Sequence, residues 1–153
     1  FALSYASYVQ PTYEVKKVES RYNGFEINSD EYYESTNKDM NTDSFAICRI
    51  DINNLNPNDL SKMTLECILD PGHSYDYFVV SKFDKELNTS TYGDNSTAVL
   101  QEFSDLNAQE TKEVSCALPN GNHTVYVKYR RYKNKYSTSE RGSFKFKVRI
   151  EKA

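Results

Sequence analysis

The sequence predicts an all-β fold: an antiparallel β-sandwich or jelly roll of about eight strands with an extended N-terminal segment. Three observations predict it. Apolar and polar residues alternate with period two in several segments. The chain of 153 residues contains 13 Tyr and 8 Phe but no Trp, a composition that favours pleated strands and an aromatic core. Polar, Asn-rich and Pro-containing segments separate the alternating stretches, and no segment shows an amphipathic helical stripe.

The alternation is clearest in residues 63–69 and 144–151. One face of the first segment carries Met63, Leu65, Cys67 and Leu69. The second segment alternates aromatic or aliphatic residues with Lys145, Lys147 and Arg149, which is typical of a half-buried strand with a solvated basic face. Further strands are expected at 12–18, 45–52, 74–83, 97–103, 112–118 and 122–132.

The segments between these strands predict turns and loops. Asn120 and Gly121 favour a tight hairpin that joins 112–118 to 122–132. One helical turn is expected at 59–63, with Asp59 as its N-cap. The polar stretches 28–44 and 84–96 predict long loops or irregular edges.

The length fits one domain, and we expect the sandwich to comprise residues 21–153. Residues 1–20 form either an edge strand or an arm that pairs with a neighbouring subunit. The first residues are too short and polar for an intact signal peptide and lack a Met, so we expect an upstream part to have been removed or the chain to be a segment of a longer one. No membrane-spanning stretch is expected.

Chemistry-bearing residues do not form a recognisable catalytic pattern. Cys48, Cys67 and Cys116 lie on apolar strand faces without zinc-site spacing. Buried reduced thiols are expected, with one disulfide plus a free thiol as the alternative. The two histidines, His73 and His123, belong to no catalytic motif. We therefore expect no enzyme activity.

Carboxylates and carboxamides leave three alternatives open. Two of Asp70, Asp76, Asp84 and Glu86 could converge as glycosidase acids, although a solvated acidic surface is the ordinary interpretation. Asp and Asn at 51–59 and 94–95 could hold calcium but lack the spacing of a calcium-binding loop, so neither a metal nor a cofactor is expected. Asn88, Asn95 and Asn122 begin glycan-acceptor triplets, which chance explains equally well.

Residues 128–136, KYRRYKNKY, combine five basic residues with three tyrosines. Such a stretch suits either a nucleic-acid-binding strip or one face of a strand. The net charge of −3 gives no global attraction to a polyanion, and strand parity places Val125, Val127 and Tyr129 toward the core. Lys128, Arg130 and Tyr132 would face outward and approach the basic face of 144–151 if these strands pair. Acidic groups from the N-terminal half are then expected to cover that face.

The segment 75–148 carries a resemblance. It contains YDYFVVSKFDKELNTST, then VLQEF, then GNHTVYVKYRRYKNKYSTSERGSFKFKV. These phrases resemble a β-sandwich module of structural head or tail proteins of tailed gut bacteriophages and of related bacterial surface proteins. In such modules Lys-Asp usually follows the Val-Lys-Tyr-Arg phrase, whereas Arg131, Tyr132 and Lys133 follow it here. The resemblance implies no catalytic residues and a location in a virion or at a cell surface.

The expected function is a non-enzymatic structural, decoration or attachment module of a tailed bacteriophage that acts through subunit contacts. The alternative is a carbohydrate-binding or adhesin module of a bacterial surface protein, with tyrosines stacked on sugar rings. Expected partners are other copies of the chain, other virion or surface proteins, or host glycans, without nucleic acid or membrane insertion. The candidate contact residues are Tyr92, Lys128, Arg130, Tyr132, Tyr136, Lys145 and Lys147.

Overall fold

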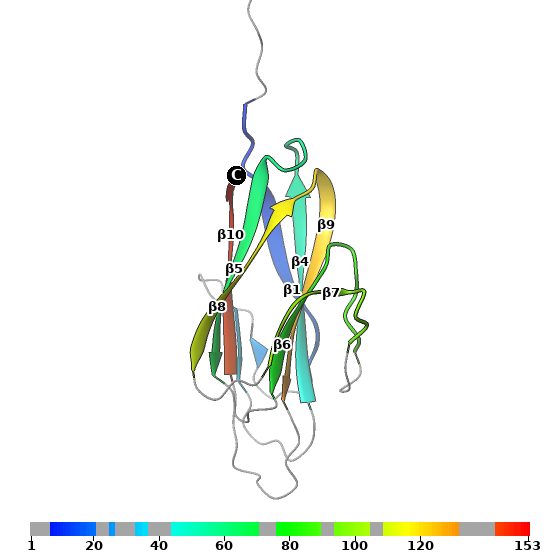
Figure 1. Ribbon diagram of the computed structural model, residues 1–153, viewed down its shortest axis with the longest axis vertical. Coiled ribbons are helices and arrows are strands. Elements are labelled where there is room, and N and C mark those ends of the chain that lie inside the picture. Colours follow the sequence, from blue (N-terminus) through cyan, green and yellow to red (C-terminus); the bar gives the residue numbers. More distant parts are fainter. Residues whose placement is uncertain are drawn as a thin grey trace, which may run out of the picture.

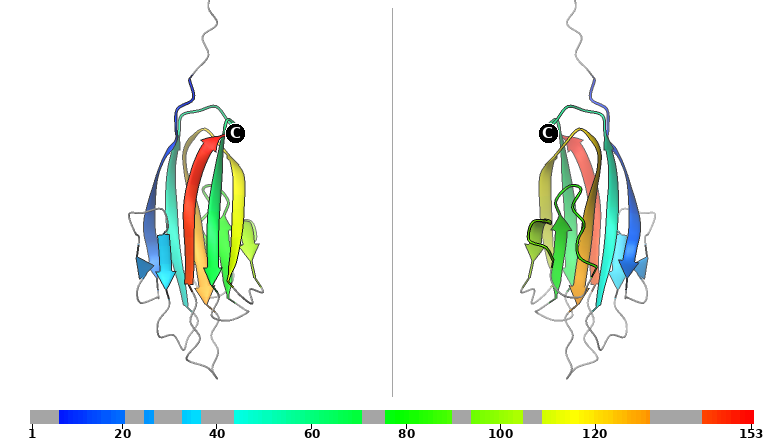
Figure 2. Two further views of the ribbon diagram at one scale, coloured as in Figure 1. Left: turned by 90° about the vertical axis from the view of Figure 1, so that its left-hand side faces the viewer. Right: turned by 90° about the vertical axis from the view of Figure 1, so that its right-hand side faces the viewer.

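A computed structural model describes residues 7–20, 25–26, 33–36, 44–70, 76–89, 94–104, 109–131 and 143–153. These residues form an all-β protein without a helix, so the predicted fold class is confirmed. Eight strands have five residues or more, and two short strands extend one of the two sheets. The two sheets pack face to face, and their strands run roughly along the long axis of the molecule (Figures 1 and 2).

The first sheet has the strand order β1-β4-β9-β6-β7 and the second has the order β2-β3-β10-β5-β8. The strands of the first sheet are β1 (Thr12–Ser20), β4 (Ser44–Asn54), β9 (Gly121–Arg131), β6 (Tyr77–Ser81) and β7 (Val99–Phe103). Those of the second are β2 (Phe25–Glu26), β3 (Tyr33–Thr36), β10 (Ser143–Lys152), β5 (Ser61–Asp70) and β8 (Glu110–Leu118). All eight predicted strand segments therefore correspond to strands.

The strand pairing is nested, which makes the sandwich a jelly roll. β6 pairs with β7, β5 with β8, β4 with β9 and β3 with β10, each time antiparallel. A long antiparallel ribbon folded over on itself gives this order, with two nested pairs in each sheet. β1 and β2 extend the roll by one strand in each sheet. Residues 12–20 are thus an edge strand beside β4.

One predicted pairing is wrong, and a second pairing that the sequence left as a condition does not occur. β8 and β9 form no hairpin, because the turn at Asn120 and Gly121 carries the chain from the second sheet to the first. Gly121 does have the positive φ that its sequence context suggested, at 106°. β9 and β10 do not pair either, so their outward basic residues lie on opposite faces of the sandwich. Alternation specifies which face of a strand is buried but not which strand lies beside it.

The core between the sheets is apolar and aromatic, as the composition predicted. Tyr129 of β9 stacks on Phe144 of β10 with ring centroids 5.2 Å apart. Phe78 lies 5.6 Å from Phe144, which joins the two sheets through ring contacts. Cys48 and Cys67 are buried free thiols in this core, whereas Cys116 is half-buried beside it. Burial raises the pKa of Cys67 to about 12 and that of Cys116 to about 11.

A hydrogen-bond network of asparagines lies at the end of the sandwich where β4 and β10 end, which we call the pole. Asn54 and Asn56 are buried, and Asn54 Nδ2 donates to the carbonyls of Leu118 and Pro119. The predicted helical turn at 59–63 is wrong. Leu60 N–H instead donates to the Pro57 carbonyl in a tight turn where Asp59 has a φ of 64°. An Asp tolerates this left-handed conformation better than most residues.

The same network holds the segment that leads into β1. Val9 N–H donates to Asn56 Oδ1 at 2.9 Å, and Asn56 Nδ2 donates to the Val9 carbonyl at 2.6 Å. Gln10 Nε2 donates to the Ile150 carbonyl of β10 at 2.7 Å. Residues 7–11 therefore lie at the same pole as the C-terminal end of β10 (Figure 1).

Candidate binding surface

The outer face of the first sheet divides into an open half and a covered half. In register across β1, β4 and β9, the open half contains three rows of outward side chains. These rows are Thr12–Asn53–Asn122, Glu14–Asp51–Thr124 and Lys16–Arg49–Tyr126. The covered half begins one row further along β4 and β9, at Ile47 and Lys128, which are both buried.

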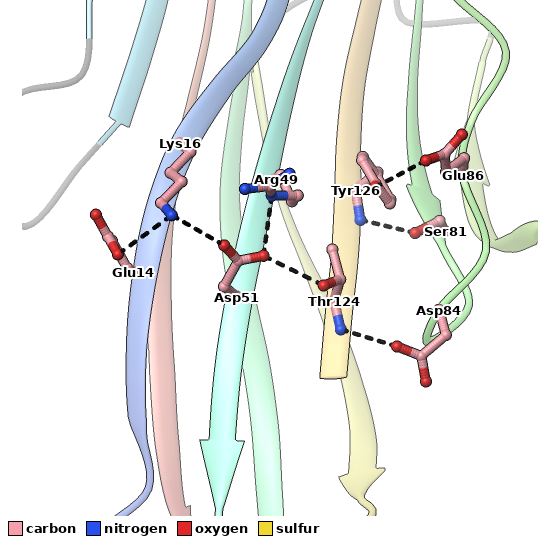
Figure 3. Close-up of polar contacts among 9 residues, drawn as sticks. All are labelled: Glu14, Lys16, Arg49, Asp51, Ser81, Asp84, Glu86, Thr124 and Tyr126. Carbon is pink, nitrogen blue, oxygen red and sulfur yellow. Dashed lines mark hydrogen bonds and ion pairs between the residues drawn. The ribbon is translucent and has the colours of Figure 1, made fainter. Parts of the chain in front are cut away.

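Asp51 is the centre of the polar contacts in the open half (Figure 3). Its Oδ1 lies 2.9 Å from Arg49 Nε and accepts a hydrogen bond from Thr124 Oγ1 at 3.2 Å. Its Oδ2 lies 3.5 Å from Lys16 Nζ. The Lys16, Arg49 and Asp51 side chains are 45, 37 and 33% exposed, so water screens these ion pairs and each contributes little to stability.

A shallow pocket of about 480 Å³ lies over the two rows of the open half that are nearest the pole, Thr12–Asn53–Asn122 and Glu14–Asp51–Thr124. Its outward side chains are Thr12, Glu14, Asp51, Asn53, Asn122 and Thr124. Two carboxylates, two carboxamides and two hydroxyls thus present hydrogen-bond donors and acceptors side by side. This set suits a polar ligand or a polar protein surface, because each group can exchange a water for a partner at little desolvation cost.

Asp84 and His123 form a charged pair at the rim of the open half. Asp84 N–H donates to the Thr124 carbonyl and Thr124 N–H donates to Asp84 Oδ1, which extends the sheet beyond β6. His123 Nδ1 lies 2.9 Å from Asp84 Oδ2, and Nε2 lies 2.7 Å from the Asn120 carbonyl oxygen. Two acceptors around one imidazole favour its doubly protonated form.

The pKa values of this pair shift apart. Partial burial lowers the pKa of His123, but the hydrogen bonds with Asp84 and the Asn120 carbonyl, together with the Asp84 charge, outweigh it and raise the pKa above its usual range. The hydrogen bond from His123 holds the pKa of Asp84 below its usual range, with help from Thr124 N–H. Each group therefore favours the charged form of the other.

The covered half lies beneath the connection between β6 and β7. We call residues 82–89 and 94–98 of this connection the covering segment; in Figure 2, right, the connection passes in front of the sheet. Leu87 and Ala98 of this segment pack with Tyr77 and Val79 of β6 in a second apolar cluster. Val79 is fully buried, so β6 is apolar on both of its faces.

Lys128 of β9 is completely buried in the covered half. Its Nζ donates to the Asn88 carbonyl at 2.9 Å and to Asp94 Oδ1 at 3.2 Å. The same Nζ lies 5.5 Å from the centroid of the Phe45 ring and 6.0 Å from that of Tyr77. Burial lowers the pKa of Lys128, although the Asp94 charge opposes this shift.

The structure does not bring the sequence-predicted contact residues together. Lys128 faces outward on its strand as parity predicted, but the covering segment buries it, so its solvent-exposed role is wrong. Arg130 lies beside it, half-buried, with its guanidinium carbon 5.2 Å from the Tyr77 ring centroid. Lys145 and Lys147 are half-buried on the outer face of the second sheet. Tyr92, Tyr132 and Tyr136 lie outside the described residues.

Two acidic residues of the N-terminal half are in register with lysines of β10 in the second sheet. Lys147 is in register with Glu66 of β5, and Lys145 is in register with Glu34 of β3. The open half of the first sheet was missed by sequence reasoning. Its signal was a pair of charged residues at alternate positions in each of two strands, Glu14 and Lys16 in β1 and Arg49 and Asp51 in β4.

Within the described residues, no three His, Cys, Asp or Glu side chains group as metal ligands would. In the stretch 51–59, one of the two that left a calcium site open as an alternative, Asn54, Asn56 and Asn58 make hydrogen bonds at the pole. His73 lies outside the described residues, as do Pro71 and Gly72. The described part of the chain contains no helix long and apolar enough to cross a bilayer.

Comparison with protein-family models, with curated proteins and with solved structures gave no significant match.

Proposed function

We propose that the chain is a non-enzymatic structural, decoration or attachment module of a tailed-bacteriophage virion, which acts through contacts with other copies or neighbouring proteins. The observation that carries this proposal is the position of the two described ends of the chain. Residues 7–11 and the end of β10 lie at one pole and are tied to each other by Gln10 and the Ile150 carbonyl. A sandwich held at one pole projects its faces and its far end toward partners.

Two further features support the proposal. The pole carries exposed apolar side chains, Val9 at 45% and Leu55 at 66%, which a contact with a supporting protein would bury. The open half of the first sheet offers a broad, charged and hydrated surface of the kind that forms the polar rim of protein interfaces. The jelly roll itself recurs in capsid proteins and in lectins, which agrees with the proposal by analogy of fold alone.

Location is the first test of this proposal. An antibody raised against the purified chain should label intact virions in electron microscopy, and pre-absorption with the chain should remove the label. Antigen found only in the soluble interior of lysed host cells, with bare particles, would contradict a virion role. Label on intact cells rather than on particles would instead indicate the bacterial surface module that the sequence left as the alternative.

The contact surface is tested by charge reversal. Asp51→Lys changes the centre of the open half, whereas Glu66→Lys makes the same change on the outer face of the second sheet. We expect Asp51→Lys to abolish incorporation into particles and Glu66→Lys to leave it intact. Circular dichroism of both variants separates loss of contact from loss of folding. Equal incorporation of the two variants would show that the open half makes no contact.

Glycan binding is the second candidate, and the 480 Å³ pocket is the observation that favours it. Its carboxylates, carboxamides and hydroxyls are groups that bond sugar hydroxyls. On an array of bacterial surface polysaccharides, binding by the chain should disappear in Asn122→Ala and persist in the control Lys147→Ala. If the chain gives no signal on the array but is still incorporated into particles, glycan binding is contradicted and only the structural role remains.

A further inference from the structure

The buried contact between Lys128 and Asp94 has the geometry of two groups that can react. Lys128 Nζ lies 3.2 Å from Asp94 Oδ1, and the two side chains are 0 and 5% exposed. Each of the other ion pairs described above has at least one partner that is more than a third exposed. We propose that Lys128 and Asp94 condense without an external catalyst to an amide bond that joins β9 to the covering segment.

The surroundings favour the neutral forms that this condensation needs. An amine attacks a carboxyl group only after it has lost its extra proton, and a carboxyl group loses an oxygen only as water. The rings of Phe45 and Tyr77 surround the Lys128 amine, and no water-exposed surface remains on it. In such a low-dielectric site, transfer of one proton from the ammonium to the carboxylate replaces two buried charges by two neutral groups. The lowered pKa of Lys128 agrees with this direction.

The two carboxyl oxygens of Asp94 have different neighbours and would take different roles in the reaction. Oδ1 faces the amine and is the oxygen that would leave. Oδ2 accepts a hydrogen bond from Tyr77 O–H at 3.3 Å and is the oxygen that would remain as the amide carbonyl. A donor at this oxygen stabilises the negative charge that develops there when the carboxyl carbon becomes tetrahedral. Tyr77 is therefore assigned as the group that activates the carboxyl.

The step is a dehydration in which atoms and charges balance. A proton first passes from Lys128 Nζ to Asp94 Oδ1, which gives an amine and a carboxylic acid. The Nζ electron pair then forms a bond to Cγ, and the electrons of the C=O bond move to Oδ2. A second proton passes from Nζ to the Oδ1 hydroxyl, this oxygen leaves as water with the C–O electron pair, and Oδ2 forms the carbonyl again. No oxidation or reduction takes place.

The product keeps two polar contacts of the reactants and gives up one, because the Asn88 N–H that donates to Asp94 Oδ1 at 3.2 Å loses that acceptor. The amide retains one N–H, which can donate to the Asn88 carbonyl that now accepts from Nζ at 2.9 Å. The amide oxygen keeps the Tyr77 hydrogen bond. A pocket lined by Tyr77, Asp94, Ser96, Val99 and Glu102 adjoins the site and gives the released water a route to solvent.

The test is the intact mass of the folded wild-type chain, measured after denaturation. We expect a mass lower than that of the sequence by one water, and a tryptic map in which cleavage after Lys128 is lost. The fragment that contains Lys128 should then be joined to the one that contains Asp94. Chain kept in denaturant from the start should retain the full mass, because only the fold brings the two groups together.

Three variants sharpen the result. Lys128→Met and Asp94→Ala should both have the full mass of their sequences, and Asp94→Asn should lose one ammonia in place of water. A full wild-type mass after prolonged incubation of the folded chain would overturn the proposal. So would a lost water that maps to a linear peptide at Asp94–Asn95, because that result indicates a succinimide. The wild-type measurement decides the question even if a variant does not fold.

Discussion

The two halves of the outer face of the first sheet are built on the same strands and differ in their access to water. In the open half, Asp51 accepts a hydrogen bond from Thr124, lies within ion-pair distance of Lys16 and Arg49, and has a side chain that is 33% exposed. In the covered half, Asp94 is bonded to Lys128, Tyr77 and Asn88 and is 5% exposed. Charged groups in the first half can exchange partners with solvent. Those in the second can only satisfy one another, so their contacts specify the position of the covering segment.

The largest expected effect comes from Asp94→Ala, which leaves the Lys128 amine buried without the carboxyl group that lies 3.2 Å from it. We expect the free energy of unfolding to fall by about 3–5 kcal/mol, as for other buried pairs that lose one partner. Urea unfolding followed by circular dichroism measures the change. The double variant Lys128→Met/Asp94→Ala removes both charges and should recover most of the loss. A decrease below about 1 kcal/mol in the single variant would mean that the covered half behaves like the open one.

Leu87→Ala tests how much apolar burial holds the covering segment in place. Leu87 is 4% exposed and packs on Tyr77 and Val79. We expect a loss of about 2–3 kcal/mol in the same urea experiment, since a buried Leu is truncated at a site that contracts in part. The matched control is Leu55→Ala, at a leucine that is 66% exposed, where a change within about 0.5 kcal/mol is expected. Equal effects at the two leucines would contradict a packed cover.

Asp51→Asn measures the open half. The substitution removes the ion pairs with Lys16 and Arg49 but keeps an acceptor for Thr124 Oγ1. Because these side chains are screened by water, we expect a loss of about 1 kcal/mol or less, which decreases further at high salt. A salt-independent loss of several kcal/mol would show that the two halves do not differ in kind.

The smallest effect is a dependence of stability on pH at the rim of the open half. The folded pKa of His123 is raised, so its contribution is complete below about pH 6.5 and is lost as the pH rises through the folded value. The folded pKa of Asp84 is lowered, so its contribution is complete above about pH 3.9 and is lost as the pH falls through the folded value. The pair stabilises most between these limits.

Titration of the His123 ring protons by NMR checks this prediction. The pKa should lie above that of an ordinary histidine in the wild type and should fall in Asp84→Asn, where the opposite charge is lost but a side-chain oxygen remains. A pKa at or below the usual value in the wild type would contradict the doubly bonded imidazole. The double mutant Asp84→Asn/His123→Gln should lose the pH dependence in this range.

Most of the strands could be predicted from the sequence because the alternation of apolar and polar residues within each strand shows which of its faces is buried. The alternation of Phe144 and Phe146 with lysines identifies β10 without reference to any other segment. The strand pairing could not be predicted in the same way. Asn120 and Gly121 suit a turn whether the chain then returns along the same sheet or crosses to the other one, and the structure shows the crossing.

The burial of Lys128 could not be predicted from its own neighbourhood, because its cover comes from residues far away in the sequence. A weaker signal was present nevertheless. Phe45 and Ile47 are apolar on the face that β4 turns outward, and the YFVVS run of β6 is apolar on both faces. Such strands need cover on each side. This signal indicates that something lies on the outer face but does not name the Lys128–Asp94 contact.

The common pole of the two described ends determines how the module responds to mechanical force. A load applied to residues 7–11 and to Lys152 acts at one end of the sandwich and reaches the ladders at their terminal rungs, Thr12–Asn53 of β1 and β4 and Lys152–Ser61 of β10 and β5. These rungs then open one after another, as in unzipping, in place of shearing all at once. We expect the fold to yield at low tension when it is pulled through these two ends.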